Sequence, residues 1–292
     1  MSAVSGTLKF FFVIVVILVL SIVLAPTVYE LLPFFKFGRI LNRLVEIFAV
    51  IAAVLFVRFE RASWRRYGVD FSTPWRRLFL YGFLTGALAI TLLTTFEVAF
   101  GPRHLRYPIL ISDVIQRFLK GTISGVAVGI AEEFLFRGFI FVSLERKMTI
   151  APAMVVTSVL YSSVHFLDNG QIFIPSKPIV GDSIRLLLGY LEPIVMRPRQ
   201  IIPEFIGLFL FGLALNTAFI RTRSLFLPIG IHAGAVFLIK FENSFVRKGA
   251  EVSHFFFGKA PLYDGLTEWL FLLVLWLVVW FTPFSKRQPS KL

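Results

Sequence analysis

Residues 121–141, GTISGVAVGIAEEFLFRGFIF, form an apolar run that is interrupted by Glu132, Glu133 and Arg137. A charged side chain near the centre of a membrane helix costs about 2.5 to 3.5 kcal/mol, so the three together cost roughly 7 to 10 kcal/mol. The ten Ile, Val, Leu and Phe residues of the run return only about 3 to 6 kcal/mol. The helix is therefore predicted to turn its polar face toward other helices or water. Small residues that permit close approach are Gly121, Ser124, Gly125, Gly129, Ala131 and Gly138.

The rest of the chain is also strongly apolar, since 57% of its 292 residues are hydrophobic and 35 are phenylalanine. A helix needs about 20 apolar residues to cross roughly 30 Å of hydrocarbon. Candidate spans lie at about 8–25, 41–58, 78–100, 118–141, 149–166, 202–220, 225–241 and 265–282. The connections leave no room for a separate soluble domain. The sequence predicts a single all-α polytopic membrane domain, 1–292, with about eight transmembrane helices and a polar site in the bundle interior.

The net charge and the absence of cysteine limit the cellular location and the types of catalytic site that the protein can have. The first span lacks a small-x-small cleavage site and is expected to be retained. The formal net charge is +13, which on a membrane protein indicates basic loops facing anionic lipid, not nucleic acid. The arginine-rich loop 58–77 predicts that its side of the membrane and both termini face the cytoplasm. The expected location is a bacterial cell membrane, with the chain as a multi-pass protein. The absence of cysteine excludes thiol nucleophiles and thiolate metal sites.

Two connections, 104–120 and 181–199, mix apolar and basic residues at helical spacing. Both are expected to form helices that lie in the membrane interface and anchor the protein to lipid. Asp182 or Ser183 is expected to cap the start of the second helix.

Helix geometry separates the two glutamates of the charged run. Glu133 and Arg137 are four positions apart and share one helix face, where carboxylate and guanidinium can neutralise each other. Glu132 points about 100° away from Glu133, and no basic residue follows it one turn along its own face. Intramembrane acids of this kind usually mark a working site. Glu132 is therefore the candidate functional acid, and Glu133 with Arg137 is interpreted as a structural pair.

Two histidines, His165 and His232, lie within apolar runs. Counted from the membrane face where the fourth span ends, Glu132 lies about 14 Å deep, His232 about 10 Å and His165 about 24 Å. Boundary errors of about 3 to 6 Å per span allow all three to share one layer. They could hold a catalytic Zn²⁺, or Glu132 could act as general base on water with a histidine partner. Both routes favour hydrolysis of an amide bond.

Three spaced elements resemble the motifs of a known family. Glu132, Glu133 and Arg137 spell EExxxR, Tyr161 to His165 resembles FxxxH, and His232 opens a segment similar to HxxxN. In this order they resemble the CAAX-protease and bacteriocin-processing family of intramembrane endopeptidases, which includes the prenyl-protein proteases. The resemblance covers about 118–241, and YGVDFSTPWRRLFLYGFLTGAL and NTAFIRTRSLFLPIGIHAG also read like that family.

The resemblance implies a role for each matching position. Glu132 would activate water and His165 would share that work, while His232 would help to stabilise the oxyanion. Glu133 with Arg137 would hold the arrangement. A metal, if bound, would be held by Glu132, His165 and His232. The implied substrate is a membrane-associated peptide or protein.

Two positions depart from the family pattern. Tyr161 stands in place of phenylalanine, which keeps the ring and adds a hydroxyl near His165 as a supporting group. Val236 stands where the family has asparagine, and valine cannot donate a hydrogen bond to an oxyanion. Losing such a donor typically costs about 10² to 10³ in rate. Asn216 or Tyr161 could supply the missing donor.

Val236 keeps a second class of function open. This alternative is a non-catalytic membrane protein that acts as a scaffold or in bacteriocin self-immunity, similar to family members linked to those roles. A third hypothesis, a transporter with Glu132 and Glu97 as proton sites, predicts broken helices in corresponding halves, and the sequence shows no such repeat. An active intramembrane protease is the leading prediction.

Overall fold

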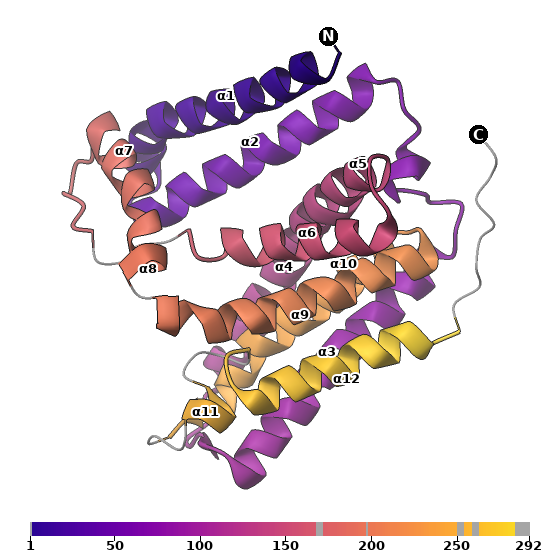
Figure 1. The fold of residues 1–292 in the computed structure, drawn as a ribbon. Helices are drawn as coiled ribbons and strands as arrows, with labels where there is room; N and C mark the ends of the chain where they lie inside the picture. The colour runs from indigo at the N-terminus through magenta and orange to yellow at the C-terminus, as the bar shows by residue number, and fades with distance from the viewer. Residues whose placement is uncertain (1, 168–171, 197, 250–253, 259–262, 284–292) are drawn as a thin grey trace. The chain divides into compact units, whose positions relative to one another are not determined.

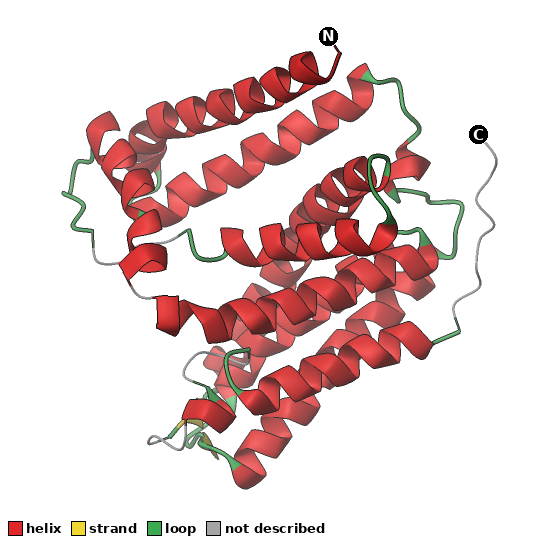
Figure 2. Cartoon of the chain, in the orientation of Figure 1, coloured by secondary structure: helices red, strands yellow, loops and turns green. Residues whose placement is uncertain are grey.

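The computed structural model describes residues 2–167, 172–196, 198–249, 254–258 and 263–283 (Figure 1). This part of the chain is helical apart from its loops and one small sheet (Figure 2). The predicted spans correspond to helices α1 (Ser2–Leu31), α2 (Phe37–Phe59), α3 (Trp75–Phe100), α4 (Ile111–Glu133) with the segment that follows it, α6 (Ile150–Val164), α9 (Pro198–Thr222), α10 (Phe226–Phe241) and α12 (Leu266–Phe281).

The length and composition of these helices support a membrane protein. Among the described residues, four helices are long and apolar enough to cross a membrane, namely α1, α2, α3 and α9. Helices α6 and α12 are apolar but shorter. The all-α membrane fold is therefore confirmed, whereas the number of eight spans stays a prediction.

The sequence predicts a single domain. In the structure the chain divides into two compact units. The first unit, Met1–Ala62 with Val164–Ile201, contains α1, α2, α7 (Val180–Gly189) and α8 (Leu191–Met196). Its core is formed by Ala25, Phe37, Leu41, Leu186 and Tyr190. The region predicted to be one interface helix, 181–199, forms α7, α8 and the start of α9, with residue 197 outside the described residues. Its place in the membrane interface stays a prediction. The Asp182 carboxylate accepts a hydrogen bond from the backbone N–H of Ile179 at the start of α7.

Helix α10 is the central helix of the second unit, which comprises Ser63–Ser163 and Ile202–Leu292. Every residue from Leu227 to Ala235 is buried, as expected for a helix that is apolar all round. Helices α3 and α4 both pack against α10, and α9 and α12 join it in a cluster of buried apolar side chains. A site residue on α10 is therefore fixed from several directions.

Glycines allow α3 and α10 to meet at backbone distance. A Cβ added at Gly82 or Gly86 of α3 would approach backbone atoms of α10 closer than 3.0 Å. The same holds in the other direction for Gly230 and Gly234 of α10 against α3. Each pair is spaced by four residues, as in the small-xxx-small contacts that drive association of membrane helices.

Helix α4 uses the glycines singled out in its sequence to approach the same central helix. A Cβ at Gly121, Gly125 or Gly129 would lie 2.9, 2.6 or 3.2 Å from a backbone carbonyl oxygen of α10. The prediction that these small residues permit close helix approach is confirmed. Because α4 carries the charged run, this contact brings the charges to α10.

The prediction of an interface helix over 104–120 is wrong for residues 104–110. Strand β1 (Arg103–Leu105) pairs antiparallel with β2 (Val246–Lys248), and α4 begins only at Ile111. Pro108 lacks a backbone N–H and disfavours the helical conformation for the residue before it. Residues 111–120 are consequently the first turns of α4 and not a separate element.

Arg103 holds together the end of the second unit that carries these strands. Its Nε pairs with Glu97 of α3, and its Nη1 lies 2.7 Å from Glu242 Oε1. Thr94 donates its hydroxyl to the other carboxylate oxygen of Glu242. Burial raises the pKa of the Glu242 carboxyl, while the Thr94 hydrogen bond and the charge of Arg103 oppose that shift. Glu97 thus has a structural partner, and this arrangement lends no support to its use as a transport site.

Replacing Gly86 by alanine is expected to destabilise the second unit. The new methyl group would meet the backbone of Ile231, and overpacking of this kind typically costs about 1 to 3 kcal/mol. The free energy of unfolding, measured by SDS titration in mixed micelles, should fall by that amount. Gly181→Ala is the matched control, because its methyl group would meet only side-chain atoms of Ile179 at 3.8 and 4.0 Å. Equal losses in the two variants would contradict the packing.

Candidate active site

The helix that carries the charged run changes its winding beside the charges. Helix α4 ends at Glu133, and Phe134–Phe141 forms a π-helical segment that leads into α5 (Val142–Glu145). Such segments are rare and are frequently found at functional sites. The interpretation of 118–141 as one regular α-helix is therefore wrong in its second part. A hydrophobicity pattern does not distinguish the two windings over so short a stretch.

Glu133 and Arg137 form the buried ion pair that their spacing predicts. Arg137 Nη1 lies 2.9 Å from Glu133 Oε1, and both side chains are 0% exposed. Arg137 also donates from Nη2 to the backbone oxygen of Gly212 in α9 at 3.2 Å. Its guanidinium carbon lies 4.5 Å from the centre of the Tyr161 ring. The pair is therefore neutralised internally and tied to α9 and α6.

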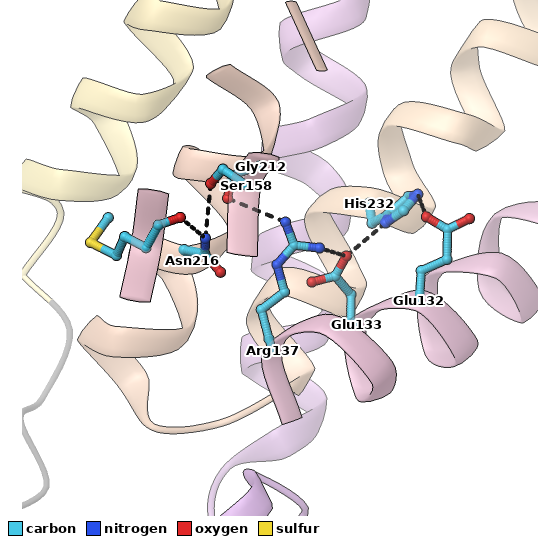
Figure 3. A network of polar contacts seen from close by, with 8 residues as sticks. Glu132, Glu133, Arg137, Ser158, Gly212, Asn216 and His232 are labelled. Carbon is cyan, nitrogen blue, oxygen red and sulfur yellow. Dashed lines mark hydrogen bonds and ion pairs between the residues drawn. The ribbon is translucent and has the colours of Figure 1, made fainter. Parts of the chain in front are cut away.

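His232 of α10 is held by the same carboxylate (Figure 3). Its Nδ1 lies 2.8 Å from Glu133 Oε1, and its Nε2 lies 3.9 Å from Glu132 Oε2. When Nδ1 donates its proton to Glu133, Nε2 is the nitrogen that faces Glu132. Glu133 therefore orients the imidazole, in addition to pairing with Arg137. Spacing along one helix could not reveal this contact, because His232 is 99 residues away in sequence.

The adjacent glutamates differ in accessibility. The Glu132 side chain is 16% exposed, whereas Glu133 is fully buried. The different directions of the two side chains on the helix predict different roles for them. The structure agrees in that the two carboxylates differ in exposure. Of the two carboxylates, Glu132 is the one that water or a substrate can reach.

Asn216 of α9 forms the interhelical hydrogen bonds expected of a structural amide. Its Nδ2 donates to the backbone oxygen of Met154 at 3.1 Å and to the Ser158 hydroxyl at 3.0 Å. Both acceptors lie on α6. Gly212, one turn earlier on α9, packs closely against Ser158. Helices α6 and α9 are thereby fixed to each other beside Arg137.

Tyr161 is enclosed by the other aromatic residues of the site. It is 1% exposed, and its ring centre lies 6.3 Å from that of His232 in an edge-on arrangement. Phe136 contacts it edge-on at 5.3 Å and Phe211 at 6.4 Å. With Arg137 over one face of the ring, the position of Tyr161 is set from several sides.

Two further motif positions, His165 and Val236, are less buried than His232, Glu133 and Arg137. His165 directly follows α6, is exposed, and belongs to the first compact unit, whereas Glu132 and His232 belong to the second. Its participation in the site stays a prediction. Val236 is half-buried on α10, one turn after His232.

Two of the three predicted metal ligands, Glu132 and His232, lie close together. In the described ranges, no group of three or more His, Asp or Glu residues is arranged to hold an ion. Glu132 and His232 supply two donors, and the third predicted ligand, His165, lies in the first unit. Catalytic Zn²⁺ sites use three protein ligands, so a Zn²⁺ site that includes His165 stays a prediction.

Comparison with known proteins identifies the family. Residues 114–238 match the family model described as type II CAAX prenyl endopeptidase Rce1-like. This segment of the chain is that of the CAAX-protease and bacteriocin-processing family. The matched region runs from the first turn of α4 into the last turn of α10. It contains the predicted site residues Glu132, Glu133, Arg137, Tyr161, His165 and His232.

The comparison with curated proteins and the comparison with solved structures gave no match. The match of 114–238 to the CAAX-protease family, together with the apolar helices, indicates a multi-pass integral membrane protein. The family is a protease family, so its chemistry agrees with the amide hydrolysis expected from the site residues.

Replacing Arg137 by methionine is expected to destabilise the protein strongly. The substitution leaves the Glu133 carboxylate buried without its arginine, and breaking a buried ion pair typically costs about 3 to 5 kcal/mol. The free energy of unfolding in mixed micelles measures this loss. Arg43→Met is the control, because Arg43 and Glu46 form a surface pair with side chains 53% and 20% exposed. Such pairs contribute about 0 to 1 kcal/mol, so a similar loss in both variants would contradict the buried network.

Proposed function

We propose that the protein is an intramembrane endopeptidase that hydrolyses peptide bonds of membrane-associated substrates. Family membership supports the reaction class. The observation that carries the mechanism is the pairing of a partly exposed carboxylate, Glu132, with a buried imidazole, His232, whose other nitrogen contacts Glu133. A reachable base beside an oriented ring is the arrangement that general acid–base hydrolysis requires.

The proposed reaction uses Glu132 first as a base and then as an acid. Its carboxylate removes a proton from water, and the water oxygen bonds to the carbonyl carbon of the peptide. The resulting oxyanion accepts a hydrogen bond from His232 Nε2–H in the doubly protonated ring. As the carbon–nitrogen bond breaks, Glu132 returns the proton to the leaving amine. The products are one carboxylic acid and one amine, which become carboxylate and ammonium by transfer of the acid's proton, and Glu132 is restored.

Glu133 and Arg137 are proposed to position this machinery without touching the substrate. Both are fully buried, and Glu133 supplies the contact that orients His232. Glu132 and Glu133 are the same residue type, so their different proposed roles follow from their different surroundings. His165 is proposed to assist Glu132 in water activation, as the family resemblance implies. Zn²⁺ held by Glu132, His165 and His232 is the corresponding proposal for a cofactor.

The proposed substrate is a peptide or protein that lies in or on the membrane. Exposed arginines in the last turn of α2, in the loop that follows and in the first turn of α3, such as Arg58, Arg61 and Arg77, suit contact with anionic lipid headgroups and not with nucleic acid. Their density supports the proposal that this side and both termini face the cytoplasm. The bacterial cell membrane is the proposed location.

Replacing Glu132 by alanine is expected to abolish proteolysis, because general base catalysis contributes about 10² to 10⁴ in rate. Membrane-protein terminal peptides are compared by mass spectrometry in cells that express the wild type or Glu132→Ala at equal levels. New termini should occur only with the wild type. Glu30→Ala, which removes an exposed carboxylate at the end of α1, should give the wild-type profile. Unchanged cleavage by Glu132→Ala would refute the mechanism.

Val236 favours a second candidate function, a non-catalytic scaffold or self-immunity protein. Valine offers no hydrogen-bond donor one turn after His232, where the ring faces Glu132. The terminal-peptide comparison distinguishes the two functions. If folded wild type and folded Glu132→Ala give the same profile, binding without cleavage is the better description, and a partner should be captured equally by both.

A further inference from the structure

A basic and aromatic surface lies where α3 and α10 begin. It comprises residues 64–77, which form the short helix η1 (Trp64–Tyr67), a loop and the first turn of α3, together with Phe226 at the start of α10. All of these residues belong to the second unit, and together they are called the basic-aromatic surface. Its exposed basic side chains are Arg65, Arg66, Arg76 and Arg77.

The positive charge of the basic-aromatic surface is not balanced by its own acidic residue. Asp70 is the only acid within 64–77, and its side chain is 5% exposed. One of its carboxylate oxygens lies 3.5 Å from Arg65 Nε and accepts hydrogen bonds from the backbone N–H and the hydroxyl of Ser72. Asp70 therefore folds the loop from inside. The outward-facing charge is positive and complements an anion.

Three aromatic rings stand among these arginines. Phe71 lies 5.8 Å from Trp75 and 5.3 Å from Phe226, and Trp75 lies 5.4 Å from Phe226, all measured between ring centres. The Arg76 guanidinium covers the Trp75 ring at 5.2 Å. Phe71 is nevertheless 67% exposed. Aromatic rings beside basic residues at the end of an apolar helix are typical of the membrane interface, where the rings reach lipid and the cations reach headgroups.

Backbone contacts fix the basic-aromatic surface before any partner binds. Tyr67 is buried, and Gly68 has a φ of +80°, a conformation that favours glycine. The Gly68 carbonyl accepts a hydrogen bond from the backbone N–H of Leu225 at 3.0 Å, directly before α10. Thr73 donates its hydroxyl to the backbone carbonyl of Asp70 at 2.6 Å. A surface that is already ordered loses little conformational entropy when it binds a ligand.

The basic-aromatic surface also contacts both segments of the proposed site. The Trp64 ring lies 6.1 Å from the ring of Phe134, the residue that directly follows Glu133. Phe226 begins the helix that carries His232. A ligand that holds Trp64 and Phe226 would therefore also restrain the two segments that meet in the contact between Glu133 and His232.

We infer that the basic-aromatic surface binds the headgroup of an anionic phospholipid and that the bound lipid supports the active site. The surface matches this ligand in its charge, in its exposed ring and in its place at the end of a membrane helix. Guanidinium groups form paired hydrogen bonds with phosphate oxygens, while Phe71 would lie against the apolar part of the lipid. The lipid binding is independent of peptide hydrolysis, and only the effect on the site rests on the proposed function.

The first test measures lipid binding and needs no substrate. The purified full-length protein is equilibrated in detergent with equal amounts of phosphatidylglycerol and phosphatidylcholine, and native mass spectrometry measures which lipid it retains. The wild type should retain phosphatidylglycerol preferentially. Each basic residue near an anionic surface contributes about fivefold to binding. Replacing Arg66, Arg76 and Arg77 together by glutamine should therefore lower this preference by about tenfold or more.

Two control variants separate this surface from positive charge in general and from folding. The first removes three positive charges elsewhere in the second unit, in Arg117→Gln, Lys120→Gln and Arg247→Gln. It should keep the wild-type preference. The second replaces the three arginines of the surface by lysine, which also binds phosphate, and should keep most of the preference. Equal retention of both lipids by the wild type, or an equal loss in the two glutamine variants, would overturn the inference.

The second test measures the effect of the lipid on the site. The protein is reconstituted in phosphatidylcholine vesicles with or without phosphatidylglycerol, and the substrate is a peptide found in the terminal-peptide comparison. Phosphatidylglycerol should raise kcat several-fold in the wild type and not in the glutamine variant of the surface. Preferential binding without this increase would refute the support of the site. Absence of cleavage in every vesicle, with the lipid preference intact, would instead refute the proposed protease.

Discussion

The structure of the site depends on how one buried carboxylate is neutralised. Glu133 lies on an apolar helix with no access to water, and a carboxylate in such surroundings is tolerated only when it is paired and hydrogen-bonded. A single oxygen of Glu133 contacts both Arg137 and His232. Arg137 in turn reaches the backbone of Gly212. Satisfying this one charge therefore links α4, α10 and α9 at the level of the site.

The helices can share these contacts only because their backbones lie close together. Helix α10 is approached by glycines of α3 and α4, and its own Gly230 and Gly234 complete the contact with α3. In lipid there is little hydrophobic gain from helix association, so close packing and hydrogen bonds supply much of the driving force. The glycines hold the backbones near enough for His232 to reach Glu133. Packing and charge neutralisation are thus two parts of one arrangement.

This arrangement explains how two neighbouring glutamates can serve different purposes. Glu133 is closed off by its partners and orients His232, while Glu132 is partly exposed beside the other ring nitrogen. The division resembles the general rule that environment, and not residue type, separates acid, base and supporting carboxylates. The proposed chemistry therefore combines Glu132 of α4 with His232 of α10.

The sequence by itself determined the membrane class, the positions of the long helices, the pairing of Glu133 with Arg137 and the family motifs, because hydrophobic length and four-residue spacing are local properties. It also identified the glycines that pack α4. Only the tertiary structure decided that α10 is central, that His232 contacts Glu133, that 134–141 winds as a π-helix and that 103–105 pairs with 246–248. These features join residues up to 145 positions apart, Arg103 and Lys248 among them. Which helix faces which is set by packing and charge compensation across the bundle, and no periodicity along one segment contains that information.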